Sequence, residues 1–545
     1  MGGNRLEQTN GPKEIRQLKR MKSHITLRDV SDKEGTLATV AANDLLKLPV
    51  EFEPIAWKEL SGETQDNYCC ILDDVLVLRI PRPKTPEEEE KLVNRFLDGM
   101  RKLLDPDNNW TFLSILETSL NYCAQCNSCA QACHLFEVSN RNEMYRPNLR
   151  SELFRRIYKQ YIARKPFAKW RYGDVRLNWK TVARLGEMAY RCTLCRRCAQ
   201  TCPIGVDNAL IAREIRKVFS QELGISPPEL HDSGSMLQLD AGPSIEKNAA
   251  AAQKYVAFID EKYSAVTGYT LHTPWDVQGA DILFITNVDP AMADPVGIAA
   301  FSIIFQKAGL SFTLSSELAG YGPANYGTFY DDVQFARTAI LHMRAAKKLG
   351  VQRIVIGECG HVQKALTVIA DRVLPRELNI PRESCFPVLR DIVFSGKIAF
   401  DPSRNDFPVT LHDPCNIVRL MGVNKPQREI LRYLCPQFRE MTPHGVENYC
   451  CGGGSGFAVM TRDNIEAWRY NLGGRKKMSQ ICGAFHECLG PETKKYICAP
   501  CESCKVQISG MLERNGLPGR NSIHCSGIAE LIVNAMVDLK PGFLE

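Results

Sequence analysis

The chain of 545 residues is long enough for two to four domains, each with its own core. Its 44% hydrophobic and 24% charged residues are typical of a globular protein, and a net charge of +6 without a supporting motif argues against nucleic acid binding. The 22 cysteines cluster at ligand spacings, which indicates metal-bound thiolates in a reducing compartment rather than a disulfide framework.

The first part of the chain is polar and basic and lacks the apolar core of a signal peptide. No run approaches the roughly 18 apolar residues of a membrane-spanning helix. We therefore expect a soluble protein that a partner can hold at a membrane. Residues 1–84 are interpreted as an N-terminal arm or partner-contact region, with one strand at 74–79. Cys69 and Cys70 have no glycine run or second cysteine pair beside them and are interpreted as structural.

A helix is predicted to begin after Thr85, because a capping threonine, a proline and an acidic first turn follow one another there. It should end near Leu103, and a second helix at about 110–120 leads into the first cysteine motif.

Two copies of the motif C-x2-C-x2-C-x3-C follow, and this is the bacterial ferredoxin run. In that run the fourth cysteine ligates the other cluster, so the two copies should exchange their last ligands. One cubane [4Fe-4S] cluster is then assigned to Cys123, Cys126, Cys129 and Cys202. The other is assigned to Cys192, Cys195, Cys198 and Cys133.

Residues 85–230 are interpreted as one domain around these motifs. The insert between the motifs repeats apolar residues at helical spacing, as in 151–161. The region therefore resembles the alpha-helical ferredoxin module, in which helices support two [4Fe-4S] clusters. Many lysines and arginines lie between Arg146 and Arg176, which favours either a basic docking surface or an ordinary solvated helix face.

Residues 231–278 are interpreted as a linker, because glycine, serine and aspartate are frequent near 231–245. From 279 onward strands and helices alternate, which predicts parallel sheets covered by helices. Two α/β halves are assigned, 279–400 and 401–545. Their predicted strands are 281–286, 311–314, 353–357, 409–413 and 496–499.

The second half carries the most unusual stretch, in which Cys450 and Cys451 precede three consecutive glycines. Adjacent thiolates can reach different irons of one cluster, and glycines allow the backbone to approach it closely. The candidate ligands are Cys415, Cys450, Cys451, Cys501 and Cys504. A zinc site is the alternative, but zinc closes with four ligands and needs no vicinal pair.

The pattern Cys…Cys-Cys-Gly…Cys-x-x-Cys resembles the CCG domain of the heterodisulfide reductase catalytic subunit (HdrD-like) family. The resemblance implies a non-cubane [4Fe-4S] cluster that cleaves a disulfide, with Cys450 and Cys451 at the catalytic centre. The segment before Cys501 is longer than in that family and includes Cys482, Cys488 and Cys498. Cys498 and Cys501 therefore compete with Cys501 and Cys504 as the terminal pair, and we prefer the latter.

The first half is predicted to be a degenerate CCG copy. It has Asn287-Val-Asp-Pro290 in place of Asp413-Pro-Cys415, and Ala319-Gly-Tyr-Gly322 in place of the vicinal pair. It keeps one thiol, Cys359, close to His361. We expect one non-cubane cluster, with His361 either a proton donor to the leaving thiolate or a packing residue. His412, His444 and His524 are weaker candidates.

Within this family the layout most resembles the DsrK-like subunit of the dissimilatory sulfite reductase-linked membrane complex. That resemblance implies electrons from menaquinol through a cytochrome b partner at the cytoplasmic face of the membrane. It also implies reduction of a disulfide or trisulfide on a DsrC-like sulfur-carrier protein. The alternative is an electron-transfer subunit of a flavin-dependent dehydrogenase of the glycerol-3-phosphate, glycolate or lactate type. In a third reading, the vicinal cysteines belong to an inert scaffold.

Overall fold

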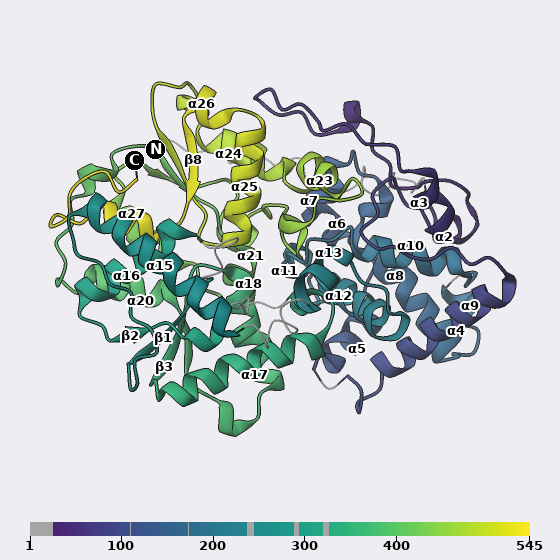
Figure 1. Ribbon diagram of the computed structural model, residues 1–545. Coiled ribbons are helices and arrows are strands. Elements are labelled where there is room, and N and C mark those ends of the chain that lie inside the picture. The colour runs from purple at the N-terminus through teal and green to yellow at the C-terminus, as the bar shows by residue number, and fades with distance from the viewer. Residues whose placement is uncertain are drawn as a thin grey trace, which may run out of the picture.

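The computed structural model describes residues 25–109, 111–172, 174–236, 245–287, 294–319 and 326–544. A helical region occupies one side of the molecule, and two small sheets with their helices occupy the other (Figure 1). Among the described residues, none of the helices combines the length and the apolar character needed to cross a bilayer.

The helical region holds both ferredoxin motifs. Its helices are α4 (Pro86–Leu103), α5 (Leu113–Asn121), α6 (Ser128–Ala132), α7 (His134–Val138), α8 (Pro147–Ile157), α9 (Ala168–Tyr172), α10 (Trp179–Ala189), α11 (Arg197–Gln200), α12 (Asn208–Val218) and α13 (Pro228–Leu230). α4 begins as its sequence predicts, because Thr85 accepts a hydrogen bond from the Glu88 amide and Pro86 occupies the first turn.

The segment before α4 differs from the arm that the sequence predicted. It includes α2 (Leu27–Asp32) and α3 (Gly62–Asn67), and 74–79 forms no strand. Leu72, Val75 and Ile80 are buried in the core of the helical region. Arg184 of α10 fastens the segment by donating hydrogen bonds to the carbonyls of Val30 and other residues. Residues 25–84 thus cover the chain's own core, and their contact with a partner stays a prediction.

The basic stretch 146–176 is not a continuous charged surface. Arg150 is buried and donates hydrogen bonds to the carbonyls of Met188 and Asn208. Arg155 pairs with Glu152 inside the same helix. The exposed segment 164–170 presents two aromatic rings with its charges, because Phe167 and Trp170 are 80% and 86% exposed.

Two α/β halves follow. The first contains α15 (Ile245–Thr267), β1 (Ile282–Ile285), α16 (Pro295–Ala308), β2 (Phe312–Thr313), α17 (Asp332–Leu349), β3 (Arg353–Ile356), α18 (Gly360–Gln363), α19 (Ala370–Val373), β4 (Arg382–Ser384) and α20 (Cys385–Phe394). The second contains β5 (Val409–Leu411), α21 (Cys415–Leu420), α22 (Lys425–Leu434), β6 (Phe438–Arg439), α23 (Ile465–Trp468), α24 (Arg475–Ala484), β7 (Lys495–Cys498), α25 (Glu502–Arg514), α26 (Leu517–Asn521), β8 (Ile523–Ser526) and α27 (Ala529–Asn534). The segment predicted as a linker therefore includes the long helix α15.

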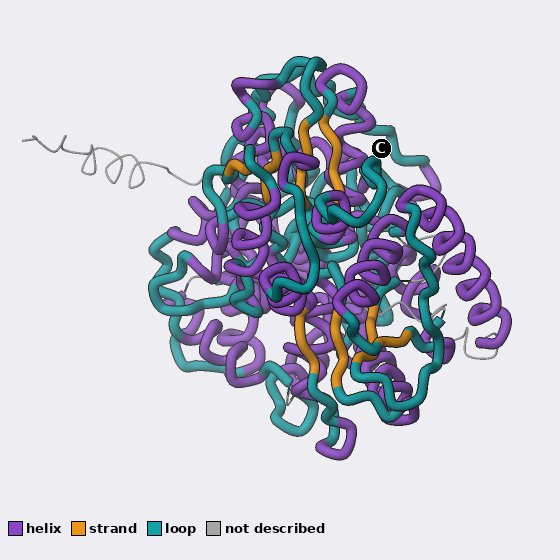
Figure 2. Tube along the Cα trace, turned by 90° about the vertical axis from the view of Figure 1, so that its left-hand side faces the viewer, coloured by secondary structure: helices purple, strands orange, loops and turns teal. Residues whose placement is uncertain are grey.

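The two sheets have the same topology, and all their strand pairs are parallel. Their orders are β2-β1-β3-β4 and β6-β5-β7-β8, so each strand of one half has a counterpart in the other. This repeat supports the predicted duplication. Figure 2 shows the two sheets one above the other, with helices between them.

Alternating side chains of each sheet enter different cores. In β1, Ile282 and Phe284 contribute to the core between the halves, whereas Leu283 and Ile285 face α17. The shared core is filled by α16 and α20 of the first half and by α22 and α27 of the second. The outer face of the second sheet packs against α24 and α25, and this is the side on which the vicinal cysteines lie.

Candidate metal centres

The first ferredoxin loop joins α5 to α6 and places three cysteines around a small cavity. The cavity of about 20 Å³ is lined by Cys123, Cys126 and Cys129, and also by Cys202 from the second motif. The expected four-thiol set therefore lies around one space, as crossed ligation requires. The assignment of these thiols as ligands stays a prediction.

The second loop repeats the backbone of the first. Gln125 and Asn127 have positive φ values of 54° and 63°, and Leu194 and Arg196, at the matching positions, have 52° and 60°. These left-handed residues turn the chain so that successive cysteines point to one centre. The thiols of the second set also come together from both motifs. Burial raises the pKa of Cys198, and the charges of Cys192, Cys195 and Cys133 raise it further because these thiols lie nearby.

The third group of thiols is assembled by loops at the carboxyl ends of strands, where α/β sheets build their sites. Cys415 begins α21 after β5, and Cys501 caps α25 after β7, with Cys504 in its first turn. The vicinal pair lies in the glycine loop before Phe457. Three elements of the second half thus hold the five thiols: the start of α21, the glycine loop and the start of α25.

The thiols of this group contact one another and reach the ferredoxin motif. The Cys450 sulfur accepts side-chain hydrogen bonds from Cys195 and Cys415, which lower its pKa. Cys451 hydrogen-bonds with Cys450 and Cys504, and these contacts hold the pKa of Cys451 well below the usual range. Through Cys195, the second ferredoxin centre and the vicinal-cysteine centre adjoin each other.

Glycines give this loop the cradle shape that a cluster requires. Gly452 has φ +96°, and a Cβ there would collide with the Gly473 carbonyl carbon. A Cβ on Gly454 would lie 2.7 Å from the carbonyl oxygen of Thr193, in the second ferredoxin loop. Backbone amides of Gly452 and Gly453 donate to the Cys450 and Cys451 sulfurs at 3.4 Å. Thiols, amide donors and a loop without side chains all fit an iron–sulfur cluster.

The cysteines that competed for the terminal position lie elsewhere. Cys498 points into the core between the halves, where burial raises its pKa and the charge of the nearby Cys435 adds to the rise. Cys482 lies on α24, and the raised pKa of its thiol comes from burial without a contribution from another cysteine. The geometry therefore favours Cys501 and Cys504 as the terminal pair.

The first half also contributes to this centre. The loop after β3 meets the loop after its counterpart β7, with the Glu502 amide donating to the Glu358 carbonyl at 3.1 Å. The Gly360 amide donates to Cys501 Sγ at 3.3 Å, and the Cys359 thiol hydrogen-bonds with Cys501. A ligand atom of His361 lies within 4.8 Å of both of these sulfurs.

His361 is held in place on two sides. Its Nδ1 lies 3.0 Å from the Ser503 hydroxyl, and its ring meets Phe329 edge-on at 5.0 Å between centroids. Burial lowers the pKa of His361, while the charge of Cys501 acts in the opposite direction. The other predicted histidines differ: His412 groups with Cys451 and Cys504, whereas His524 lies on β8, where burial lowers its pKa.

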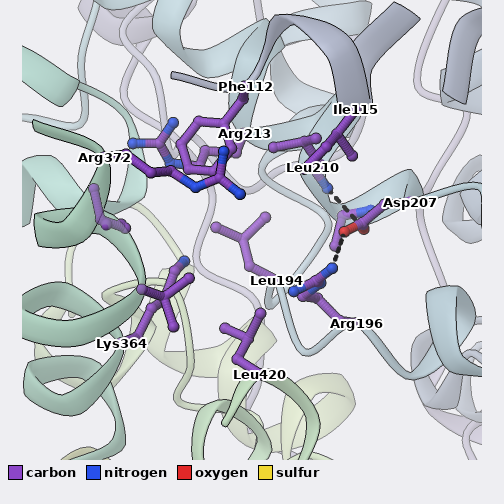
Figure 3. Close-up of a pocket in the computed structure, with 13 residues that line it drawn as sticks. Phe112, Ile115, Leu194, Arg196, Asp207, Leu210, Arg213, Lys364, Arg372 and Leu420 are labelled. Atoms are coloured by element: carbon purple, nitrogen blue, oxygen red, sulfur yellow. Dashed lines mark hydrogen bonds and ion pairs between the residues drawn. The ribbon is translucent and has the colours of Figure 1, made fainter. Parts of the chain in front are cut away.

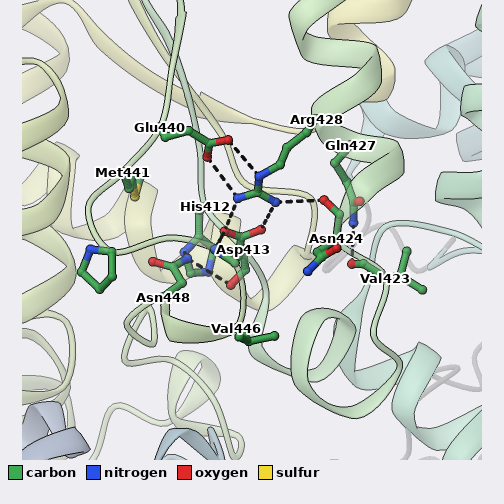
Figure 4. Close-up of polar contacts among 12 residues, drawn as sticks. His412, Asp413, Val423, Asn424, Gln427, Arg428, Glu440, Met441, Val446 and Asn448 are labelled. Carbon is green, nitrogen blue, oxygen red and sulfur yellow. Dashed lines mark hydrogen bonds and ion pairs between the residues drawn. The ribbon is translucent and has the colours of Figure 1, made fainter. Parts of the chain in front are cut away.

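An ion pair supports the loop that precedes Cys415 (Figure 4). The Arg428 guanidinium on α22 donates two hydrogen bonds to the Asp413 carboxylate at 2.8 and 2.7 Å, and its Nε donates to Glu440 at 2.9 Å. Asp413 also accepts the Gly445 amide at 2.6 Å. The pair thereby ties β5 to α22 and to the loop that leads to the vicinal cysteines.

Two further residues escaped prediction because their sequence context is an ordinary charged helix. Arg419 on α21 donates to the carbonyls of Cys195 and Val446 at 2.8 and 2.7 Å and so joins the ferredoxin loop to the CCG loop. Lys477 on α24 is fully buried and donates to Asn448 at 2.7 Å. Burial lowers the pKa of Lys477 to about 7, although the nearby Asp413 and cysteine charges oppose that change.

Comparison with known proteins identifies both parts. Residues 119–206 match the 4Fe-4S dicluster domain family, and residues 409–509 match the cysteine-rich domain family. The chain is 29% identical over 508 residues to the Hdr-like menaquinol oxidoreductase iron-sulfur subunit 2 of Archaeoglobus fulgidus, covering 83% of this chain and 84% of the relative. No solved structure matches the chain.

Two more distant relatives extend the comparison. The D subunit of the dihydromethanophenazine:CoB–CoM heterodisulfide reductase of Methanosarcina acetivorans is 23% identical, over 64% of this chain and 81% of its own length. The B subunit of the fumarate reductase (CoM/CoB) of Methanothermobacter marburgensis is 25% identical, over 77% of this chain and 73% of its own. The chain is similar to iron–sulfur subunits of heterodisulfide-reductase-like oxidoreductases. It has a ferredoxin domain followed by a duplicated α/β region, as its sequence predicted.

Proposed function

We propose that this chain is the electron-transferring and catalytic iron–sulfur subunit of a menaquinol-linked membrane complex. In this proposal it reduces a disulfide or trisulfide on a small sulfur-carrier protein of the DsrC type, as a DsrK-like subunit. Each disulfide takes up two electrons and two protons and yields two thiols. The A. fulgidus relative, named as a menaquinol oxidoreductase subunit, supports the electron source.

The observation that carries the proposal is the contact between Cys195 and Cys450. When bound, two cubane clusters at the ferredoxin motifs supply one-electron transfer, and a non-cubane cluster at the five CCG cysteines supplies disulfide chemistry. Cys195 belongs to one group and Cys450 to the other, so no partner needs to bridge the two sites. The buried Arg419 fixes the spacing of their loops.

The chain's own groups supply the remaining requirements at the vicinal-cysteine site. Gly360 and the glycine loop donate amide hydrogen bonds to sulfur, which offset negative charge. His361 is the proposed proton donor, because it lies beside Cys501 and is oriented by Ser503. Replacement of His361 by Ala should slow turnover without loss of iron. An unchanged rate across the pH range would instead make it a packing residue.

A membrane cytochrome b-type protein is the proposed electron donor, which would hold this chain at the cytoplasmic face of the membrane. The exposed segment 164–170 suits such a contact, because the rings of Phe167 and Trp170 stand in solvent beside the charges of Arg164, Lys165 and Lys169. Aromatic and basic side chains together favour docking at a membrane-adjacent acidic surface.

The second candidate is a pure electron-transfer subunit of a flavin-dependent dehydrogenase, in which the vicinal cysteines perform no disulfide chemistry. The match of residues 119–206 to the 4Fe-4S dicluster domain suits electron transfer in either candidate. The thiol of Cys359 beside Cys501 favours the first candidate, because electron transfer alone needs no additional thiol at the centre.

An iron count with low-temperature EPR on anaerobically purified, oxidised protein separates the two functions. Three four-iron clusters require about 12 Fe per chain. We expect that total, together with a paramagnetic oxidised signal that changes when a thiol substrate is added. About 8 Fe without such a signal would leave two cubanes and replace disulfide reduction by electron transfer.

A further inference from the structure

A cavity of about 200 Å³ lies between the ferredoxin domain and the first α/β half. Its walls come from α5, the second ferredoxin loop, the start of α12, the π-helical turn Lys364–Ile369 with α19, and the end of α21. Much of the wall is apolar and consists of Phe112, Ile115, Leu194, Leu210, Val368 and Leu420. The function proposed above makes no use of this space.

Cationic side chains outnumber carboxylates around the cavity (Figure 3). Arg196, Arg213, Lys364 and Arg372 line it, against the single carboxylate of Asp207. Two of the four cations are already neutralised by neighbours. Arg196 pairs with Asp207 at 2.7 Å, and Arg213 pairs with Glu214 at 2.9 Å and with Asp332.

The other two cations have no carboxylate partner among the described residues. Arg372 donates to the Thr111 carbonyl at 2.7 Å and lies 4.9 Å from the centre of the Phe112 ring. Lys364 extends its amine into the cavity and makes no hydrogen bond within the described part of the chain. Burial, with the charges of Arg213 and Arg196, lowers the pKa of Lys364 to about 7, and the opposing charges of Cys415 and Asp207 offset this only in part.

The cavity also adjoins two candidate centres. Leu194 and Arg196 flank Cys195 in the second ferredoxin loop, and Leu420 ends the helix that Cys415 begins. A group bound here would therefore lie against the loop and the helix whose thiols meet at Cys450.

We propose that this cavity binds an organic anion, a carboxylate or similar oxyanion on an apolar body, with Lys364 and Arg372 as its counter-ions. An oxyanion accepts hydrogen bonds from both side chains, and the apolar walls cover the remainder of the ligand. The carboxylate belongs either to a free organic acid or to the end of a polypeptide, since both present the same chemistry. The site does not depend on the identity of the disulfide substrate.

The test is calorimetric titration of the anaerobically purified, cluster-loaded full chain. The probes are benzoate, the neutral benzamide and inorganic phosphate. We expect benzoate to bind, and benzamide and phosphate to bind at least about 10-fold more weakly, because each lacks either the charge or the apolar body. Equal binding of benzamide, or no binding of benzoate, would overturn the proposal.

Matched variants locate the binding. Lys364→Met and Arg372→Met should each weaken benzoate binding about 10-fold or more, with unchanged iron content. Lys347→Met and Arg376→Met remove exposed cations of the same half that do not line the cavity, and should leave the affinity unchanged. Benzoate binding that survives both cavity substitutions would place the anion elsewhere.

Two short peptides, identical except for a free or an amidated carboxyl terminus, distinguish the sources. Tighter binding of the free peptide than of benzoate, lost in Lys364→Met, assigns the cavity to the end of a polypeptide. Tighter binding of benzoate assigns it to a small acid. Equal affinity for both peptides, unaffected by Lys364→Met, would contradict recognition of a carboxylate.

Discussion

The ion pair between Arg428 and Asp413 offers a quantitative test of how the CCG loop is held. Arg428→Met keeps most of the side-chain volume and removes the guanidinium. The Asp413 side chain is 1% exposed, and in this variant its carboxylate still accepts the hydrogen bond from the Gly445 backbone amide but has lost the guanidinium. Removing one member of a buried pair costs about 3–5 kcal/mol, because the remaining charge stays desolvated and unpaired.

Arg432→Met on the same helix is the matched control. Arg432 also pairs with Glu440, but at 3.5 Å and with its side chain 65% exposed. A pair in that setting contributes about 0–1 kcal/mol. Combining Arg428→Met with Asp413→Asn should recover part of the loss, since the double variant no longer buries an unpaired carboxylate.

Native-state hydrogen exchange of peptides spanning β5 and α22 is the suitable assay, because a cluster-binding multidomain chain does not unfold in two states. A loss of about 3–5 kcal/mol corresponds to exchange that is roughly 150- to 4,000-fold faster. The reasoning fails if Arg428→Met accelerates exchange no more than Arg432→Met, or if the double variant loses the sum of both single losses.

Three further outcomes are expected. Cys451→Ser should abolish disulfide turnover while both ferredoxin clusters remain reducible, and loss of both ferredoxin signals would refute that division. Gly454→Ala should slow electron transfer between the centres, measured after flash reduction, because the new Cβ meets the Thr193 carbonyl at 2.7 Å; Gly483→Ala, which meets nothing within 4 Å, is the control. Burial lowers the pKa of His342 to about 4, below its unfolded value of about 6.5. The buried neutral histidine therefore contributes its full stability above pH 6.5, and this is lost as the unfolded side chain takes up a proton. By pH 5.5 the opening free energy of α17, measured by hydrogen exchange, should fall by about 1.4 kcal/mol. His342→Gln should not show this loss.

Local signals allowed the sequence to predict the helix after Thr85, the two ferredoxin motifs and, within a residue or two, five of the eight strands in the part of the chain that the structure describes. β4, β6 and β8 were missed because their residues, RES, FR and IHCS, do not form the apolar run that indicates a buried strand. The segment 74–79 was wrongly predicted as a strand: its apolar residues are buried against helices, and the Leu78 amide donates to Glu187 instead of another strand. Apolar runs this short do not specify their partner.

The contacts between residues from distant parts of the chain were harder to predict than the motifs. Spacing alone was enough to predict the cysteine sets, but Arg419 and Lys477 reach their positions only when α21 and α24 fold against the vicinal-cysteine loop. For Cys498, in contrast, spacing suggested a place in the site that the fold does not favour. By spacing it competed with Cys504, yet it lies on β7, where alternation along the strand directs it into the core between the halves. Strand phase favours Cys501 and Cys504 as the terminal pair, and that phase can be assigned only once the ends of the strand are known.

The arrangement of the two sheets explains why the first α/β half, which lacks the five-cysteine set, still contributes to the vicinal-cysteine site. Because the sheets repeat one topology, the loops after β3 and β7 are counterparts and meet across the shared core. The first contributes the Gly360 amide to Cys501 Sγ, together with Cys359 and His361. A lone second half would expose Cys501 to water on this side. The degenerate half therefore encloses the vicinal-cysteine centre on one side and supplies its polar neighbours. The two copies of the duplicated fold thus line the same site, although only the second carries the five cysteines.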